Sequence, residues 1–224
     1  MKKILIAGIC LMGLYFSSYA QTYTLSQSSS AYSSISGTTL ASGSSWNGKG
    51  YKIPIGFSFS FMGKSFDTLT IAPNGLILFG DDNKRAIAAF KGIMPVTDSK
   101  NNTSSISYAS SGNILKIEYK NVGFGLYHPD NFNFQVWLSK SGNTIEFHTG
   151  ATTLSVPWDS LTGGVPDSLI MPVVGIINPS MDKSNNGYLL AGNPLQPTAE
   201  TLIGDLKYLI RVPDANTVYK LTPQ

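Results

Sequence analysis

The clearest hydrophobic pattern in the chain lies between positions 53 and 61. Large apolar residues occupy every odd position, and proline, glycine or serine occupies every even one: Ile53, Ile55, Phe57, Phe59 and Phe61 alternate with Pro54, Gly56, Ser58 and Ser60. Because successive side chains of a strand point to opposite faces, this spacing predicts a strand with one buried face. We expect the rest of the chain to pack on that face.

A tight turn is predicted shortly after this strand. Asn74-Gly75 separates the apolar pair Leu69 and Ile71 from the apolar run 76–79. Asn-Gly between apolar runs is typical of a β-hairpin, because both residues tolerate positive φ.

Short strand-like segments continue along the chain, whereas no window shows sustained helical periodicity. Apolar and polar residues alternate in 114–120, 132–138 and 144–149, Leu169 to Ile177 is nearly all apolar, and further candidates are 187–190, 206–212 and 218–221. Only Ala86 to Phe90 is suited to a helical turn. Many short strands separated by turn residues predict an all-β, antiparallel β-sandwich, jelly-roll-like and with little helix.

The first 20 residues have the pattern of a secretory signal peptide. A basic start, an apolar run over 4–16 and the small-residue site Ser18-Tyr19-Ala20 follow one another. We therefore expect a periplasmic or extracellular protein whose single β-sandwich domain covers 21–224, with a Ser/Thr/Gly-rich edge segment over 21–50. The only cysteine, Cys10, lies inside the signal, so no disulfides are expected.

Charge excludes one class of partner. The net charge is +3, only 13% of residues are charged, and no basic run occurs. Nucleic acid is not an expected partner, since its recognition depends on clustered Lys and Arg. Beyond the signal, no membrane span is expected, and the sequence does not indicate the oligomeric state.

Motifs of catalysis are weak. No nucleophile elbow, zinc-protease helix or phosphate-binding glycine loop occurs. Glu146 and His148 lie two apart on one strand face, where such a pair could bind a metal or relay a proton. The simpler interpretation is a solvated strand face.

One segment resembles a calcium loop. Asp182, Ser184 and Asn186 place oxygen ligands at alternate positions before Gly187, as calcium loops do. The twelfth position is Asn193 rather than a bidentate glutamate. Clusters of serine and asparagine also form ordinary turns, which is the alternative interpretation. No cofactor other than calcium at this segment is expected.

Aromatic residues suggest where a ligand could bind. Trp46 and Trp158 fall in predicted loops, as does Asp98, and Trp137 faces away from the Phe132 to Leu138 apolar row. Exposed rings suit stacking on the apolar face of a sugar. The alternative is that the rings cover the ends of the sandwich. These four residues are the candidate ligand-binding positions.

Several stretches together resemble a known extracellular module. They are Ile55-Gly56-Phe57-x-Phe59-x-Phe61-x-Gly63-x-x-Phe66, Asn74-Gly75-x-Ile77-x-Phe79-Gly80, Ile117 to Val122, Phe134 to Leu138, and Val174-Gly175-Ile176. This pattern is similar to the nidogen-type (NIDO-like) domain and to a related β-sandwich module of secreted and surface proteins of Gram-negative bacteria. The resemblance implies adhesion or interaction and supplies no catalytic residues.

Three functions remain open from the sequence. The first is a secreted, non-catalytic binding or adhesion module that recognises a glycan or a surface protein. The second is a glycan-active enzyme using strand-face carboxylates, which requires two carboxyl groups about 5–9 Å apart. The third is a structural subunit of a surface assembly, which predicts a long unpaired edge strand.

Overall fold

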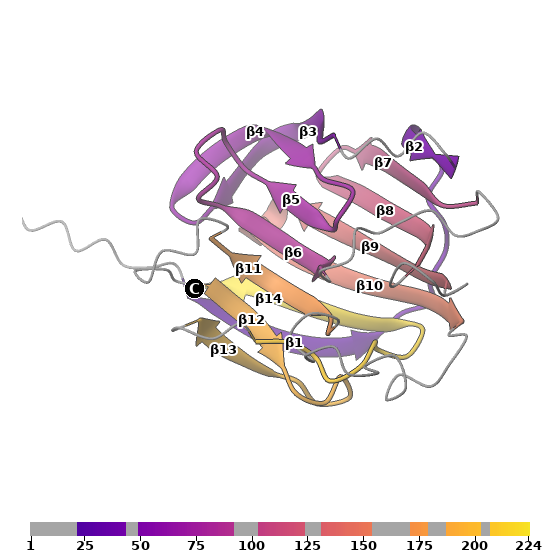
Figure 1. The fold of residues 1–224 in the computed structure, drawn as a ribbon. Coiled ribbons are helices and arrows are strands. Elements are labelled where there is room, and N and C mark those ends of the chain that lie inside the picture. The colour runs from indigo at the N-terminus through magenta and orange to yellow at the C-terminus, as the bar shows by residue number, and fades with distance from the viewer. Residues whose placement is uncertain are drawn as a thin grey trace, which may run out of the picture.

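The computed structural model describes residues 22–43, 49–91, 103–123, 131–153, 171–178, 187–202 and 207–224. The strands of these residues form two seven-stranded antiparallel sheets that lie face to face (Figure 1). The β-sandwich predicted from the sequence is therefore confirmed.

Each sheet has a defined strand order. Sheet A contains, in spatial order, β1 (Tyr23–Ser29), β14 (Thr217–Pro223), β10 (Thr144–Thr153), β9 (Asn131–Ser139), β8 (Ile114–Val122), β7 (Ser105–Ser111) and β2 (Thr38–Ser42). Sheet B contains β13 (Thr198–Leu202), β12 (Gly187–Ala191), β11 (Val173–Ile177), β6 (Ala86–Lys91), β5 (Leu76–Leu78), β4 (Lys64–Ile71) and β3 (Tyr51–Phe61).

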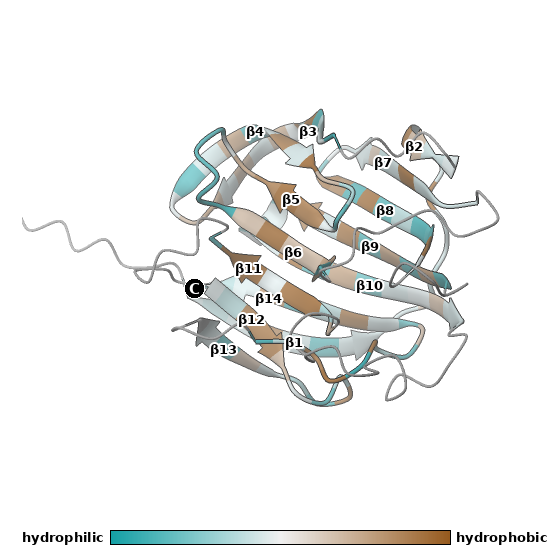
Figure 2. Ribbon diagram, in the orientation of Figure 1, coloured by the Kyte–Doolittle hydropathy of each residue, from teal (hydrophilic) through white to brown (hydrophobic). Residues whose placement is uncertain are grey.

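The alternating stretch forms β3, as predicted, and its apolar face is buried. The odd-numbered side chains from Ile53 to Phe61 are at most 9% exposed. Phe59 lies 5.9 Å from Phe79 and 6.4 Å from Phe61, measured between ring centroids. Hydrophobic positions likewise alternate with paler ones along the strands in Figure 2. Although the apolar side chains of β3 form part of the hydrophobic core, the strand itself lies at the edge of sheet B.

The predicted hairpin at Asn74-Gly75 is also confirmed, with a different turn geometry. β4 and β5 pair antiparallel across it, and Gly75 has a φ of 82°. Asn74 keeps a negative φ, and its side-chain Oδ1 accepts a hydrogen bond from the Leu76 N–H at 3.3 Å. Two consecutive positive φ values occur instead at Met62-Gly63, between β3 and β4, and at Gly142-Asn143, between β9 and β10.

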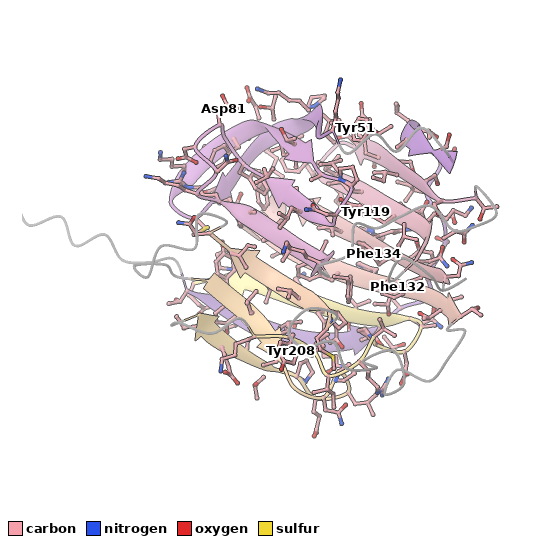
Figure 3. The ribbon with its side chains drawn as sticks, in the orientation of Figure 1. Tyr51, Asp81, Tyr119, Phe132, Phe134 and Tyr208 are labelled. Carbon is pink, nitrogen blue, oxygen red and sulfur yellow. The ribbon has the colours of Figure 1, made fainter. Side chains whose placement is uncertain are left out.

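Aromatic side chains from both sheets fill the interior. Figure 3 labels Tyr119, Phe132 and Phe134 on sheet A, and the Tyr119 and Phe134 rings stack with centroids 4.7 Å apart. Phe90 of β6 packs edge-on against Phe132 from the opposite sheet. Tyr119 donates its hydroxyl hydrogen bond to the Ala72 carbonyl at 2.9 Å, and burial raises the pKa of this phenol.

Two sequence predictions are wrong. Ala86 to Phe90 forms strand β6 rather than a helical turn, because all five residues are buried between β5 and β11. The predicted strand over 206–212 is absent from its described part, 207–212, where Leu209 makes only an isolated bridge to Gly192. In contrast, the described part of the apolar run 169–177 contains a fully buried inner strand, Val173–Ile177. No helix within the described ranges is long and apolar enough to cross a membrane.

Residues 30–37, here called the crossing segment, connect opposite edges of sheet A. β1 and β2 are separated by six strand intervals, a span of about 29 Å. The chain from Ser29 to Thr38 reaches about 30 Å when fully extended, so it has to run nearly straight. Tyr32 and Ser33 contact side chains on the outer face of sheet A. The predicted edge segment over 21–50 therefore contributes both edge strands of this sheet, β1 and β2, and the crossing segment that connects them.

Candidate functional site

Four side chains form a row across the outer face of sheet A. The strand register places Lys220 beside Glu146, Glu146 beside Trp137, and Trp137 beside Lys116. The neighbours of these residues along each strand, such as Ile145 and Val136, point into the core, so the row itself points outward. All four are partly exposed. We call this set the open row.

A second row runs alongside the open row and is largely buried. His148, Gln135 and Glu118 are cross-strand neighbours and are 6%, 1% and 2% exposed, respectively. The crossing segment lies over part of this row: the Tyr32 hydroxyl donates to Glu118 Oε1 at 2.8 Å, and Gln135 Nε2 donates to the Ser33 carbonyl at 2.8 Å. We call these three residues the covered row.

Glu118 is a buried carboxylate held by neutral donors. Its Oε1 accepts hydrogen bonds from Tyr32 and from Gln135 Nε2, the latter at 2.9 Å. No ion pair of Glu118 occurs within the described residues. Burial, reinforced by the charge of Glu118, raises the pKa of Tyr32, so this phenol remains a hydrogen-bond donor.

Trp137 is fixed from three directions. His148 stacks on its ring with centroids 3.9 Å apart, and Lys116 Nζ lies 3.6 Å from the ring centroid. Because β10 and β8 flank β9 on opposite sides, these two groups cover opposite faces of the indole. The indole Nε1–H donates to Gln135 Oε1 at 2.8 Å. The covered row therefore holds the ring of the open row in one orientation.

Glu146 is stabilised as an anion by two neighbours. His148 Nε2 lies 2.9 Å from its Oε2, and Lys220 Nζ lies 3.0 Å from its Oε1. The hydrogen bond with His148, and then that with Lys220, lower the pKa of Glu146 to about 2, although partial burial opposes the change. Glu146 is therefore ionised at neutral pH and is not a general acid there.

This low pKa predicts an acid-dependent loss of stability. A carboxylate whose folded pKa lies below its unfolded value of 4.5 stabilises the fold above pH 4.5, and that contribution is lost as pH falls toward 2. Over this pH window, the unfolding free energy of the Glu146→Gln variant should fall by on the order of 1 kcal/mol less than that of the unaltered protein. Urea unfolding at pH 5, 4 and 3 measures it.

Glu200→Gln is the matched control for that experiment. Glu200 pairs with Lys207 at 3.3 Å, but both side chains are about 40% exposed. An exposed pair contributes little to stability. If Glu200→Gln changed the pH dependence of the unfolding free energy as much as Glu146→Gln does, the acid-dependent loss could not be assigned to Glu146.

The sequence predictions for this site have mixed outcomes. Trp137 lies on the predicted face, but His148 is not the solvent-exposed side chain that the simpler interpretation expected, because Trp137 covers it. No group of three His, Cys, Asp or Glu side chains suited to a metal ion occurs among the described residues. The remaining candidates lie outside the described residues: Trp46, Asp98, Trp158, Asp182, Ser184 and Asn186.

The residues that surround Trp137 were not predicted as site residues. Lys116, Gln135 and Glu118 come from different strands, and only the pairing register brings them together. One signal was visible in sequence: Gln135 and Glu118 are polar residues with apolar neighbours on both sides. Their juxtaposition with Tyr32 depends on the crossing segment, which alternation does not reveal.

A comparison with protein families matches residues 22–223 to the family described as NIDO related. The chain belongs to the NIDO-related family. No curated protein and no solved structure matches it. The resemblance predicted from the β3 region and the later strands is thus confirmed. Both rows of the NIDO-related chain, from Lys116 to Lys220, lie within the matched region, as does Tyr32.

Proposed function

We propose that this NIDO-related protein is a secreted, non-catalytic binding module whose open row recognises an acidic glycan. The observation that carries the proposal is the arrangement around Trp137, where an indole is held rigidly on a flat sheet face and covered by one lysine. Rigid aromatic platforms lose little entropy on binding. The signal-like N-terminus supports export, which N-terminal sequencing of the exported chain would check.

Lys116 explains the preference for an anionic ligand. No carboxylate lies within ion-pair distance of its ammonium group in the described part of the chain. Its contact with Trp137 is worth about 0.5–1 kcal/mol, whereas a hydrogen bond to a charged acceptor is worth about 1.5–3 kcal/mol. A sugar carboxylate or sulfate would therefore draw Lys116 off the ring, and the freed indole face could stack on the sugar.

The two carboxylates near this face support binding rather than hydrolysis. Glu146 is held ionised by its hydrogen bonds with His148 and Lys220, and Glu118 lies under the crossing segment. Strand spacing places their Cα atoms about 12 Å apart, with Trp137 and Gln135 between the strands that carry them. A glycosidase pair instead needs facing carboxyl groups, one of which is protonated.

The Lys116→Met variant tests the proposal. It keeps the length of the side chain and removes its charge, so we expect affinity for oligogalacturonate to fall about tenfold, the equivalent of about 1.4 kcal/mol. Isothermal titration with oligogalacturonate, dextran sulfate and neutral dextran measures the preference. Binding to the two anionic glycans should also weaken with added salt.

Lys84→Met is the matched control, because Lys84 is an exposed lysine in the loop between β5 and β6 of sheet B. It should bind like the unaltered protein. Equal losses in the two variants would indicate a nonspecific charge effect. Equal affinity for neutral and anionic glycans, or no affinity for either anionic glycan, would contradict the proposal.

A further inference from the structure

The two sheets formed by the described residues have four edge strands, and β3 is the longest of them. Its free edge is interrupted in several ways. Pro54 lacks an N–H, Gly56 has a φ of 91°, and the pairing with β4 shifts between Pro54 and Phe59. Side chains from β7 and from the turn between β9 and β10 also occupy the edge: Ser110 Oγ donates to the Ile55 carbonyl, and Asn143 Oδ1 accepts from the Ser60 N–H. β3 is therefore protected against pairing with another chain.

Two further edges carry weaker forms of the same protection. β2 has only five residues, and its pairing with β7 shifts between Thr39 and Ala41. β13 also has five residues, and it carries Glu200, which is paired with Lys207. Short length, irregular register and charge are the usual means of blocking edge-to-edge association.

β1 has none of these features. It pairs with β14 over all seven residues without a register shift, and its sequence contains no charged residue, proline or glycine. Six of its seven side chains are not buried. A regular, uncharged and exposed edge is the kind that accepts another strand.

The direction of its backbone groups follows from the ends of the strand. Ser30 N donates to the Asn216 carbonyl, and Gln224 N donates to the Thr22 carbonyl, so even-numbered residues bond to β14. Odd-numbered residues then point their N–H and C=O groups away from the sheet. For Leu25, Gln27 and Ser29, the described part of the chain supplies no backbone partner on that side.

Exposed apolar side chains lie beside this edge. Leu195 and Ile210, which are 54% and 49% exposed, are the exposed large hydrophobic residues of the described chain. Leu195 follows Pro194, whose carbonyl accepts a hydrogen bond from Gln27 Nε2 at 3.1 Å. Ile210 N donates to the Gly192 carbonyl in the same region. Residues 192–195 thus link β1 at Gln27 with the segment that carries Ile210.

We propose that β1 is a dimer seam, at which a second copy adds its own β1 antiparallel about a two-fold axis through Ser26. The odd-numbered residues, whose backbone groups point away from β14, would then lie opposite one another, with Leu25 opposite Gln27 and Tyr23 opposite Ser29. The two Leu25–Gln27 pairs of this register form about four backbone hydrogen bonds between the copies. It joins the two A sheets into one continuous sheet.

A second copy suits this edge because the strand is complementary to itself. Neither β1 contributes a charge, and the nearest lysines, one Lys220 on each side, would lie three strand intervals apart, about 14 Å. The two-fold axis also brings both copies of the Leu195 and Ile210 patch to the seam. Each copy has one such edge, so the assembly closes as a dimer instead of growing into a fibre.

Sedimentation velocity over a concentration range of about 1–100 µM tests the proposal. We expect the purified protein to reach twice the monomer mass. Ser26→Lys and Ser26→Glu each place like charges directly opposite at the axis, and each variant alone should remain monomeric. An equimolar mixture of the two variants should again form dimers, because opposite charges then face each other.

Ser65→Lys is the matched control, since Ser65 is an exposed serine of β4 that does not lie on an edge strand. It should leave the dimer intact. Circular dichroism melting should show that all the variants fold. A wild-type monomer at the highest concentration, a dimer that both Ser26 variants preserve, or a mixture that stays monomeric would each overturn the proposal.

Discussion

Phe59→Ala should lower the free energy of unfolding by about 3–5 kcal/mol, because the cavity left by a fully buried ring cannot be refilled by rigid neighbours. Phe59 is 0% exposed and lies among the rings of Phe57, Phe61 and Phe79. The only cysteine is Cys10, so no intrachain disulfide shares the task of stability. Urea unfolding monitored by fluorescence measures the change.

Phe66→Ala provides the comparison for Phe59. Phe66 pairs with Phe59 across β3 and β4 and also contacts Phe79, but its side chain is partly exposed. The same deletion there should cost about 1–2 kcal/mol, since less apolar surface returns to water. Equal losses at the two positions would show that the core does not centre on the β3 face.

Gln135→Leu should destabilise the protein by about 2–4 kcal/mol, because it leaves buried polar groups without partners. Gln135 donates to Glu118 Oε1 and accepts from Trp137 Nε1, and it is 1% exposed. Removing it takes one hydrogen bond from Glu118 Oε1, which keeps the one from Tyr32, and leaves the indole N–H of Trp137 without its acceptor. Chemical denaturation at pH 7 measures the loss.

The Glu118→Leu/Gln135→Leu double variant shows whether the loss of stability comes from missing hydrogen-bond partners or from the altered shape of the side chain. Replacing both members of a buried hydrogen-bonded pair by apolar groups is often close to neutral. The double variant should therefore lose less stability than the sum of the two single variants, although the Tyr32 hydroxyl and the Trp137 N–H still lose their acceptors. If its loss equals or exceeds the sum of the two single losses, Glu118 and Gln135 do not act as a pair.

Local pattern was sufficient to predict the strands that have at least one fully apolar, buried face. The alternation in β3 and the apolar run in β11 identify these strands, because burial of one or both faces leaves a direct mark on the sequence. Ala86 to Phe90 was mistaken for a helical turn because alanine favours helices. Its burial on both sides between β5 and β11 outweighs that preference.

The candidate site was much less predictable than the strands. Trp137 could be assigned to the outer face, since its neighbours Val136 and Leu138 belong to the apolar row. Its contacts with Lys116 and His148 depend on which strands are adjacent and in what register, which is a property of the whole sheet. The burial of Glu118 depends in addition on the path of the crossing segment between two distant edges.

The indole Nε1–H signal of Trp137 reports on the open row directly. The chain contains three tryptophans, so ¹⁵N–¹H spectra of the indole region should be simple, and Trp137→Phe assigns the signal of interest. If an acidic glycan binds at the open row, titration with oligogalacturonate will shift the Trp137 signal until it saturates. A Trp137 signal that stays in place while Trp46 or Trp158 shifts, or while bound glycan is detected by calorimetry, would contradict binding at this face.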